Sequence, residues 1–178
     1  MNNLNINLSF RLPLEQSMCE SCKRNSEEYF QLKAQIRFSF YNLIELREVK
    51  KRIFNHFKNN KNLNKILEIE DKLDIYMRNH SEMEKISSYF RGNFVCSQKK
   101  SRKLMGRDNL RSKEIYRYFI SIVLYNIKRG TQILFKGEKY IVLNVEKENL
   151  VLRDIKLGKK KKIIISKSIN YIEIVKTV

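Results

Sequence analysis

A strict alternation of apolar and polar side chains over residues 29–40 constrains the fold of this chain most strongly. Every even position from Phe30 to Phe38 is apolar, and the odd positions between them carry glutamine, lysine or arginine. A two-residue period is typical of a half-buried β-strand. Residues 5–14 alternate in the same way, so the sequence predicts two strands with a short loop between them.

Two later stretches show the three- and four-residue spacing of helices. Residues 43–57 carry one apolar stripe at this spacing, which predicts a helix. A second helix is expected from Ser81 to Gly92, because Ser81 and Glu84 match a capping box. In that motif the serine hydroxyl accepts from a first-turn amide, and the glutamate accepts from the amide of the serine.

Strand patterns separate and follow these helices. Residues 72–76 read as a short strand, and residues 94–104 and 113–124 read as two long ones. Between the long strands, residues 106–109 are of types that tolerate positive φ in turns. The sequence therefore predicts a long hairpin.

The pattern changes after Tyr125, where several short strands follow one another with turns between them. Their predicted ranges are 131–135, 139–145, 150–155, 161–166 and 171–175. Close, regular spacing of short strands is typical of a small barrel. The predicted fold class is α+β, with an antiparallel-sheet body and two helices over residues 1–125 and a small SH3-like β-barrel over residues 126–178.

Net charge is the strongest indication of function. The chain has 37 lysines and arginines against 19 acidic residues, a net charge of +18. Such an excess is most easily explained by a polyanionic partner, and nucleic acid is the first candidate. A lysine-rich surface that only improves solubility is the alternative. A membrane surface is not expected, because the cations are not gathered on one amphipathic helix.

Two clusters of cations are the candidate RNA-binding residues. One lies along the predicted hairpin and the other follows the turn at Gly158; together they comprise Lys99, Lys100, Arg102, Lys103, Arg107, Arg111, Lys113, Lys159, Lys160, Lys161 and Lys162. Lysines on an edge strand also prevent aggregation, which is the alternative interpretation. Tyr116, Tyr118 and Phe119 in the second hairpin arm either stack on bases or belong to the core.

A C-x-x-C motif at Cys19 and Cys22 is half of a zinc site. Cys96 is a candidate third ligand and His56 or His80 a fourth, but nothing local brings them together. The alternative is a loop with two thiols and no metal. We expect no cofactor, unless a partner supplies further zinc ligands.

No catalytic motif is recognisable, and the two histidines are isolated in the sequence, so we expect no enzyme activity. An odd number of cysteines and a start without a secretory signal predict a cytoplasmic protein. No apolar run approaches the length of a membrane span.

Several motifs follow one another in an order found in one known family. They are Cys19 and Cys22 with Gln35-Ile36-Arg37, Leu73-Asp74-Ile75-Tyr76 before a helix, Ser101-Arg102-Lys103-Leu104 with Asp108 and residues 116–124, and Lys128-Arg129-Gly130 with Gly137 and Tyr140. The chain resembles the large ribosomal subunit export adaptors, the family of the third nonsense-mediated-decay factor, in a shortened, archaeal-type form. Its last segment is similar to a domain of initiation factor five A.

The resemblance implies a non-enzymatic factor that binds the large ribosomal subunit, through ribosomal RNA and proteins, at the intersubunit face during maturation or quality control. It implies no membrane and no DNA partner. Earlier C-x-x-C motifs of the family's zinc region are not found here, so that region is expected to be lost or supplied by a separate chain. A general RNA-binding or translation-factor-like module, or an RNA-modifying enzyme, remains an alternative.

Overall fold

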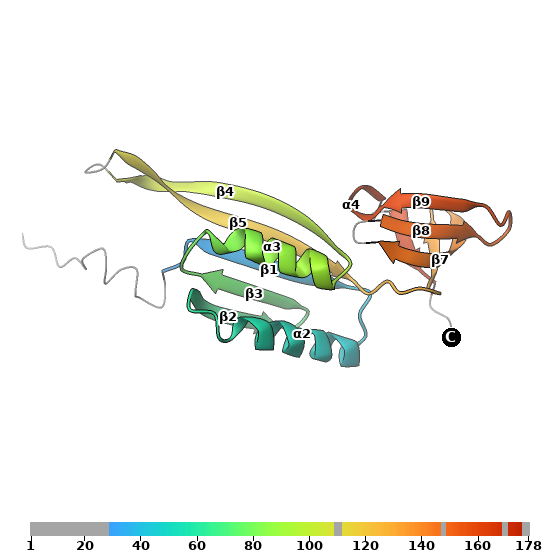
Figure 1. The fold of residues 1–178 in the computed structure, drawn as a ribbon, viewed down its shortest axis with the longest axis horizontal. Helices are drawn as coiled ribbons and strands as arrows, with labels where there is room; N and C mark the ends of the chain where they lie inside the picture. The colour runs from blue at the N-terminus through green and yellow to red at the C-terminus, as the bar shows by residue number, and fades with distance from the viewer. Residues whose placement is uncertain (1–28, 109–111, 147–148, 169–170, 176–178) are drawn as a thin grey trace, which may run out of the picture.

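The computed structural model describes residues 29–108, 112–146, 149–168 and 171–175 (Figure 1). Residues 5–14 and the C-x-x-C motif lie outside the described residues, so the predictions for them remain predictions. The described part contains two five-stranded sheets and is rich in antiparallel pairs, which confirms the α+β class.

The first sheet has the strand order β2-β3-β1-β5-β4. Its strands are β1 (Leu32–Ser39), β2 (Leu63–Ile69), β3 (Lys72–Met77), β4 (Cys96–Asp108) and β5 (Lys113–Tyr125). The long hairpin predicted from the sequence is β4 and β5. Strand β1 pairs antiparallel with β3 but parallel with β5, so the predicted antiparallel sheet contains one parallel pair.

Helices α2 (Leu43–Phe57) and α3 (Glu82–Asn93) cover the same face of this sheet (Figure 1). Ile53 of α2 and Phe90 of α3 are fully buried in one cluster with the even-numbered residues of β1. Asn42 begins α2 through a side-chain oxygen that accepts from the Glu45 amide at 2.8 Å. The sequence-predicted stripes of both helices are therefore their buried faces.

The capping box predicted for α3 is wrong. The Ser81 side chain makes no capping hydrogen bond, because its backbone is already helical at φ −59° and ψ −20°. The Ser81 amide instead donates to the Asn79 side chain at 2.9 Å. Glu84 forms an ion pair with Lys100 of β4, so it does not fold back on the start of its own helix.

The second sheet is antiparallel, in the order β10-β6-β7-β8-β9. Its strands are β6 (Gln132–Phe135), β7 (Glu138–Glu146), β8 (Asn149–Asp154), β9 (Lys160–Ile164) and β10 (Ile172–Ile174). The predicted closed SH3-like barrel is not confirmed, because β9 and β10 end the sheet without pairing in the described residues. The chain turns into the short helix α4 (Ile165–Ser168), where the sequence predicted that the strand continues.

Each sheet has its own cluster of buried residues. The second cluster begins with Tyr125, the last residue of β5, and continues with Ile127 in the following segment. The segment between the sheets is tied to α2, since the Glu45 carboxylate accepts from Asn126 and from Lys128 at 2.6 Å each. The hydrogen bond from Lys128, with a smaller contribution from Asn126, lowers the Glu45 pKa against the opposing effect of burial.

Nowhere in the described ranges is there a helix that is long and apolar enough to cross a bilayer.

Candidate functional site: two clusters of basic residues

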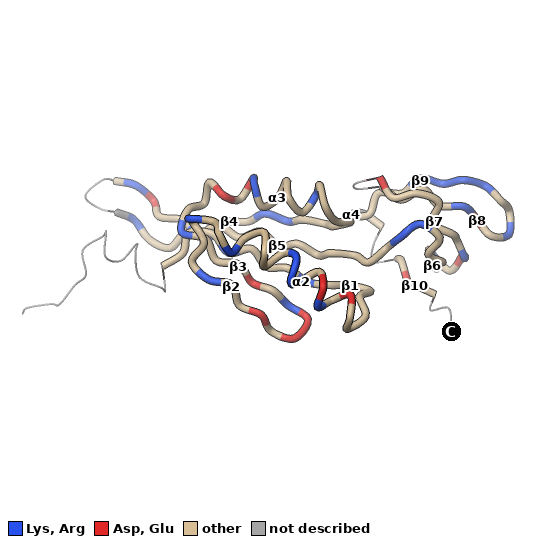
Figure 2. Tube along the Cα trace, turned by 60° about the horizontal axis from the view of Figure 1, so that its bottom comes forward, with Lys and Arg blue, Asp and Glu red and all other residues tan. Residues whose placement is uncertain are grey.

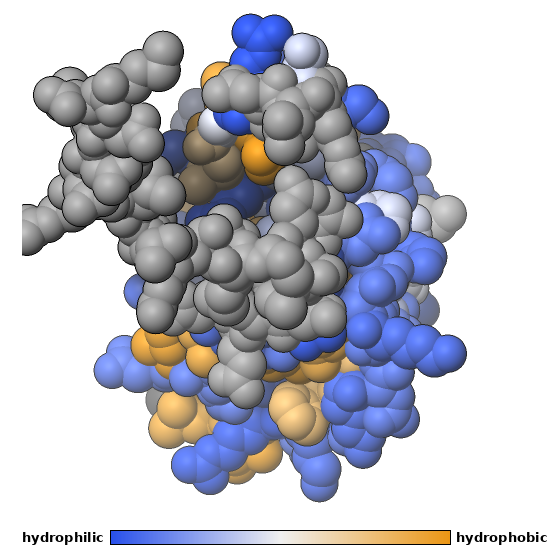
Figure 3. Space-filling view, turned by 90° about the vertical axis from the view of Figure 1, so that its left-hand side faces the viewer, coloured by the Kyte–Doolittle hydropathy of each residue, from blue (hydrophilic) through white to orange (hydrophobic). Residues whose placement is uncertain are grey.

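The β4–β5 hairpin extends beyond the rest of the first sheet. Strand β1 pairs only with the last eight residues of β5, from Tyr118 to Tyr125, whereas β4 and β5 remain paired as far as Asp108 and Lys113. A register shift between Leu104 and Gly106 marks a bulge in the outer half. Figure 1 shows this half projecting from the sheet, and Figure 3 shows mostly hydrophilic described surface at that end, with hydrophobic patches between.

The hairpin cations fall on two faces because side chains alternate along a strand. Lys100 and Arg102 lie on the side of the helices: Lys100 pairs with Glu84 of α3, and Arg102 lies 4.7 Å from the centre of the Tyr116 ring. The remaining described cations of this cluster are exposed and form no ion pair within the described ranges; they are Lys99, Lys103, Arg107 and Lys113. Arg111 lies outside the described residues.

The second cluster lies at the turn before β9 and along β9 itself (Figure 2). Lys161 shares a side of the sheet with buried residues, and its ammonium lies 5.1 Å from the centre of the Phe135 ring. Lys162 pairs with Glu146 at 2.7 Å. Lys159 and Lys160 are exposed and form no ion pair among the described residues. Two of the four lysines are thus available to a partner without breaking an internal contact.

The turn that presents these lysines is fixed by Asp154. This buried carboxylate accepts from the amides of Lys156 and Leu157 at 2.7 and 2.9 Å. The Asp154 amide donates to the Lys159 carbonyl, which closes the turn. Gly158 has φ +67°, a conformation that a residue with a side chain rarely adopts. The glycine was predicted from the sequence but the role of Asp154 was not; its position four residues before Gly158 is the available signal.

The predicted aromatic residues have three different environments. Tyr118 stacks on His80, with 4.8 Å between ring centres, and packs against the first core. Tyr116 donates to Glu114, and this hydrogen bond raises the pKa of the tyrosine. Phe119 is half-buried on the opposite side of the sheet from Tyr118. Their place in one strand therefore does not give them one role.

The additional zinc ligands considered in the sequence analysis do not come together. Cys96 is buried in the first core. His56 stacks on Tyr89, and His80 stacks on Tyr118. In the part of the chain that the structure describes, no three metal-ligating side chains form a group. These residues do not fit a zinc site, and Cys19 and Cys22 lie outside that part.

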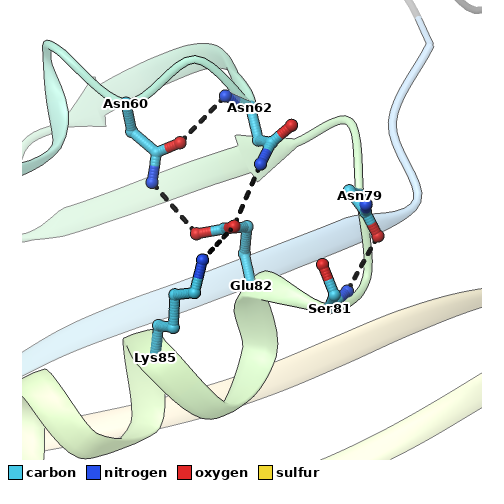
Figure 4. A network of polar contacts seen from close by, with 6 residues as sticks. All are labelled: Asn60, Asn62, Asn79, Ser81, Glu82 and Lys85. Atoms are coloured by element: carbon cyan, nitrogen blue, oxygen red, sulfur yellow. Dashed lines mark hydrogen bonds and ion pairs between the residues drawn. The ribbon is translucent and has the colours of Figure 1, made fainter.

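A buried carboxylate that the sequence analysis missed belongs to α3. Glu82 accepts from the side-chain amides of Asn60 and Asn62 at 3.0 Å each and from Lys85 at 2.9 Å (Figure 4). Its side chain is 3% exposed. The bond from Lys85 lowers the Glu82 pKa, and the two asparagines add to this against the opposing effect of burial. The network fastens α3 to the turn before β2, and its signal in the sequence is the asparagine-rich run at 59–62.

Exposed cations on a projecting hairpin and on a sheet edge are features expected of proteins that bind polyanions. A comparison with family models identifies NMD3, second domain, over residues 29–124, which is more than half of the chain. The chain belongs to the NMD3 family, as its motif order predicts, and is a ribosome-related factor. No significant match was found among curated proteins.

Proposed function

We propose that this chain binds the large ribosomal subunit at its intersubunit face and acts in subunit maturation or quality control. The match to NMD3 over residues 29–124 is the observation that carries the proposal. That region includes the projecting hairpin with its exposed cations. The proposal is of a non-enzymatic, cytoplasmic factor, whose contacts are with ribosomal RNA and ribosomal proteins rather than with DNA or a membrane.

The proposed mechanism is electrostatic docking from two units, residues 1–125 and 126–178. Lys99, Lys103, Arg107 and Lys113 contact phosphates from the hairpin, and Lys159 and Lys160 contact them from the second sheet. Ammonium and guanidinium groups without an internal partner displace counterions from RNA at little structural cost. A factor held in this way keeps other ligands and the small subunit away until it is released.

Sedimentation tests the proposal directly. Tagged full-length protein in an extract of its own cells is separated on a sucrose gradient, and its position is compared with those of both subunits and of free RNA. We expect it with free large subunits at low salt. Equal distribution over small subunits and bulk RNA would instead support the general RNA-binding module, and its absence from all particles would refute both.

The salt dependence of binding tests whether the hairpin cations contact phosphates. The variant Lys103→Gln/Lys113→Gln removes two exposed cations, and Lys51→Gln/Lys58→Gln removes two exposed cations from α2 and the residue after it. Each lost phosphate contact reduces the slope of log affinity against log salt by about 0.7–0.9. We expect this reduction for the hairpin variant alone. Equal slopes in both variants would exclude these hairpin lysines as phosphate ligands.

Metal analysis tests the expectation that the chain alone has no cofactor. We expect atomic emission of the purified full chain to find much less than one zinc per chain, because two cysteines supply only half of a tetrahedral site. One tightly bound zinc per chain would show that Cys19 and Cys22 have further ligands, from this chain or a second copy.

A further inference from the structure

The face of the first sheet opposite α2 and α3, which we call the open face, carries an ordered pattern of residues. Paired positions across the sheet, from β2 to β4, read Lys65, Tyr76, Lys33, Phe119 and Ser101. Residues that pair in adjacent strands share a face, so these five side chains form one row. Cations and aromatic rings alternate over its first four positions.

Neighbouring rows increase the positive charge of the open face. They add Arg117 and Lys103 in the next row on one side, and Lys72 and Arg37 two rows away on the other. Asp74 also lies on this face, but it is bound by Lys33 at 2.9 Å and Arg37 at 3.0 Å. Burial acts to raise the Asp74 pKa, yet the two cations outweigh it and the pKa is lowered. The carboxylate therefore stays ionised. Its single negative charge is outnumbered by the lysines and arginines of the open face, so the face keeps a net positive charge.

The aromatic rings of the row differ in what they already contact. The Tyr76 ring has the ammonium groups of Lys33 and Lys65 at 5.1 and 5.4 Å from its centre, and Phe30 packs edge-on against it at 4.9 Å. Phe119 is half-buried and makes no ring or cation contact with other described residues. Its ring is the one in this row that can accept a stacking partner without losing a present contact.

We propose that the open face binds unpaired nucleotides of RNA, with one base stacked on Phe119 and phosphates further along the strand held by Lys65 and Lys72. The inference rests on the proposed function, because it names the RNA element that the factor grips. Bases in a duplex are stacked on each other and cannot reach a side-chain ring, whereas unpaired bases can. The alternation of charge and ring fits a strand of phosphates and bases better than an apolar protein surface.

The first test uses the ring. Fluorescence anisotropy of a labelled twelve-nucleotide single-stranded RNA is measured with the full-length chain and with Phe119→Leu. Leucine keeps the apolar volume but removes the stacking face, so affinity should fall about fivefold to tenfold. Phe54→Leu is the matched control, because Phe54 is 49% exposed on α2, and it should bind like the unchanged chain. Equal affinity of Phe119→Leu and the control would overturn the stacking.

The second test uses the charges. Lys65→Gln/Lys72→Gln replaces two exposed residues that belong to neither basic cluster, so misfolding is not expected. The salt slope for single-stranded RNA should fall by about 1.4, which corresponds to two phosphate contacts. Lys51→Gln/Lys58→Gln is again the control. A duplex RNA of the same length bound as tightly as the single strand would overturn the inference, and so would equal slopes for the two variants.

The two proposals fail separately. One outcome is that the unchanged chain sediments with large subunits, and that the open-face variants bind RNA oligonucleotides and subunits as tightly as the unchanged chain. The proposed function is then supported, and the open face is not the RNA site. If subunit binding falls in these variants while oligonucleotide binding does not, a ribosomal protein occupies the face, and the RNA assignment is wrong. If the oligonucleotides bind to the open face as expected but the chain does not bind large subunits, the proposed ribosomal function is wrong.

Discussion

The two sheets of this chain differ in how much of their positive charge is held in ion pairs, and each also carries exposed cations that form none among the described residues. At the first sheet, several cations are held in ion pairs. Lys33 and Arg37 pair with Asp74 on the adjacent strand, and Lys50 of α2 pairs with Glu68 of β2. Lys85 pairs with Glu82 within α3. At the second sheet, Lys159 and Lys160 lie exposed before and at the start of β9 without an ion pair in the described residues. The charge of +18 is therefore partly structural and partly available to a partner.

The largest loss of stability is expected at Glu82, whose buried network supports the first sheet. Glu82→Ala leaves the amide groups of Asn60 and Asn62 without their acceptor in a site where the carboxylate is 3% exposed. Removing a buried acceptor that two part-buried donors share costs about 2–3 kcal/mol. Urea denaturation measures this loss. The midpoint should fall, and the slope of the free energy of unfolding against urea concentration should not change.

Glu84 supplies the control for that prediction. It lies two residues further along α3, is 73% exposed, and pairs with Lys100 on the surface. Glu84→Ala should cost less than about 1 kcal/mol, as exposed ion pairs generally do. Similar losses for the two substitutions would mean that the buried network adds nothing beyond an ordinary surface pair.

A smaller loss is expected at Lys50, the buried lysine of α2. Its ammonium donates to the Glu68 carboxylate at 3.0 Å and to the Glu70 carbonyl, and it thereby ties α2 to β2 and the following turn. Lys50→Met keeps the aliphatic packing, and Glu68 is 62% exposed and can be hydrated. We expect a loss of about 1 kcal/mol by urea denaturation. Lys51→Met, at an exposed position, is the control and should change stability by less than about 0.5 kcal/mol.

Acid should weaken the first sheet through Asp74 and Glu82. The pKa of each is lowered in the folded chain, Glu82 mainly by Lys85, and Asp74 by Lys33 and Arg37 against the larger single effect of burial. The unfolded chain therefore binds protons first, and stability present above the ordinary carboxyl pKa is lost as the pH falls through the folded pKa values. In Asp74→Asn/Glu82→Gln the loss between pH 5 and 3 should be smaller, as denaturation at each pH will measure. An unchanged loss would assign acid sensitivity to other groups.

How much of this fold the sequence predicted depends on how local each signal is. Residues 43–57 and the β4–β5 hairpin were predicted because their periods and turn residues lie within the segments themselves. The parallel pairing of β1 with β5 joins residues more than eighty positions apart, and no local pattern encodes it. Strand β2 was missed because its apolar residues do not alternate: Ile66 packs against the first core, whereas Leu67 and Ile69 lie exposed on the other face.

The candidate sites were predicted to a similar extent. The lysine run before and within β9 was visible as composition, but which lysines are available depends on strand register and on Glu146 and Phe135. Burial of Lys50 was not predictable from its helix, because its partners come from β2 and the next turn. Composition therefore finds a basic region, and tertiary contacts decide which of its charges have a structural role.

The four lysines at β9 allow the smallest and most specific test of this division. Lys161→Gln/Lys162→Gln removes the contact with the Phe135 ring and the ion pair with Glu146, at a cost of about 0.5–1 kcal/mol. Lys159→Gln/Lys160→Gln removes no such contact and should leave stability within about 0.5 kcal/mol.

The order of the two variants should reverse in binding to large subunits. The salt slope should fall more for Lys159→Gln/Lys160→Gln, because these two lysines have no internal partner among the described residues. Thermal or urea denaturation measures the first ranking, and sedimentation over a range of salt concentrations measures the second. The same ranking in both measurements would mean that one set of lysines has both roles, and the contrast between structural and available charge would not hold at this sheet.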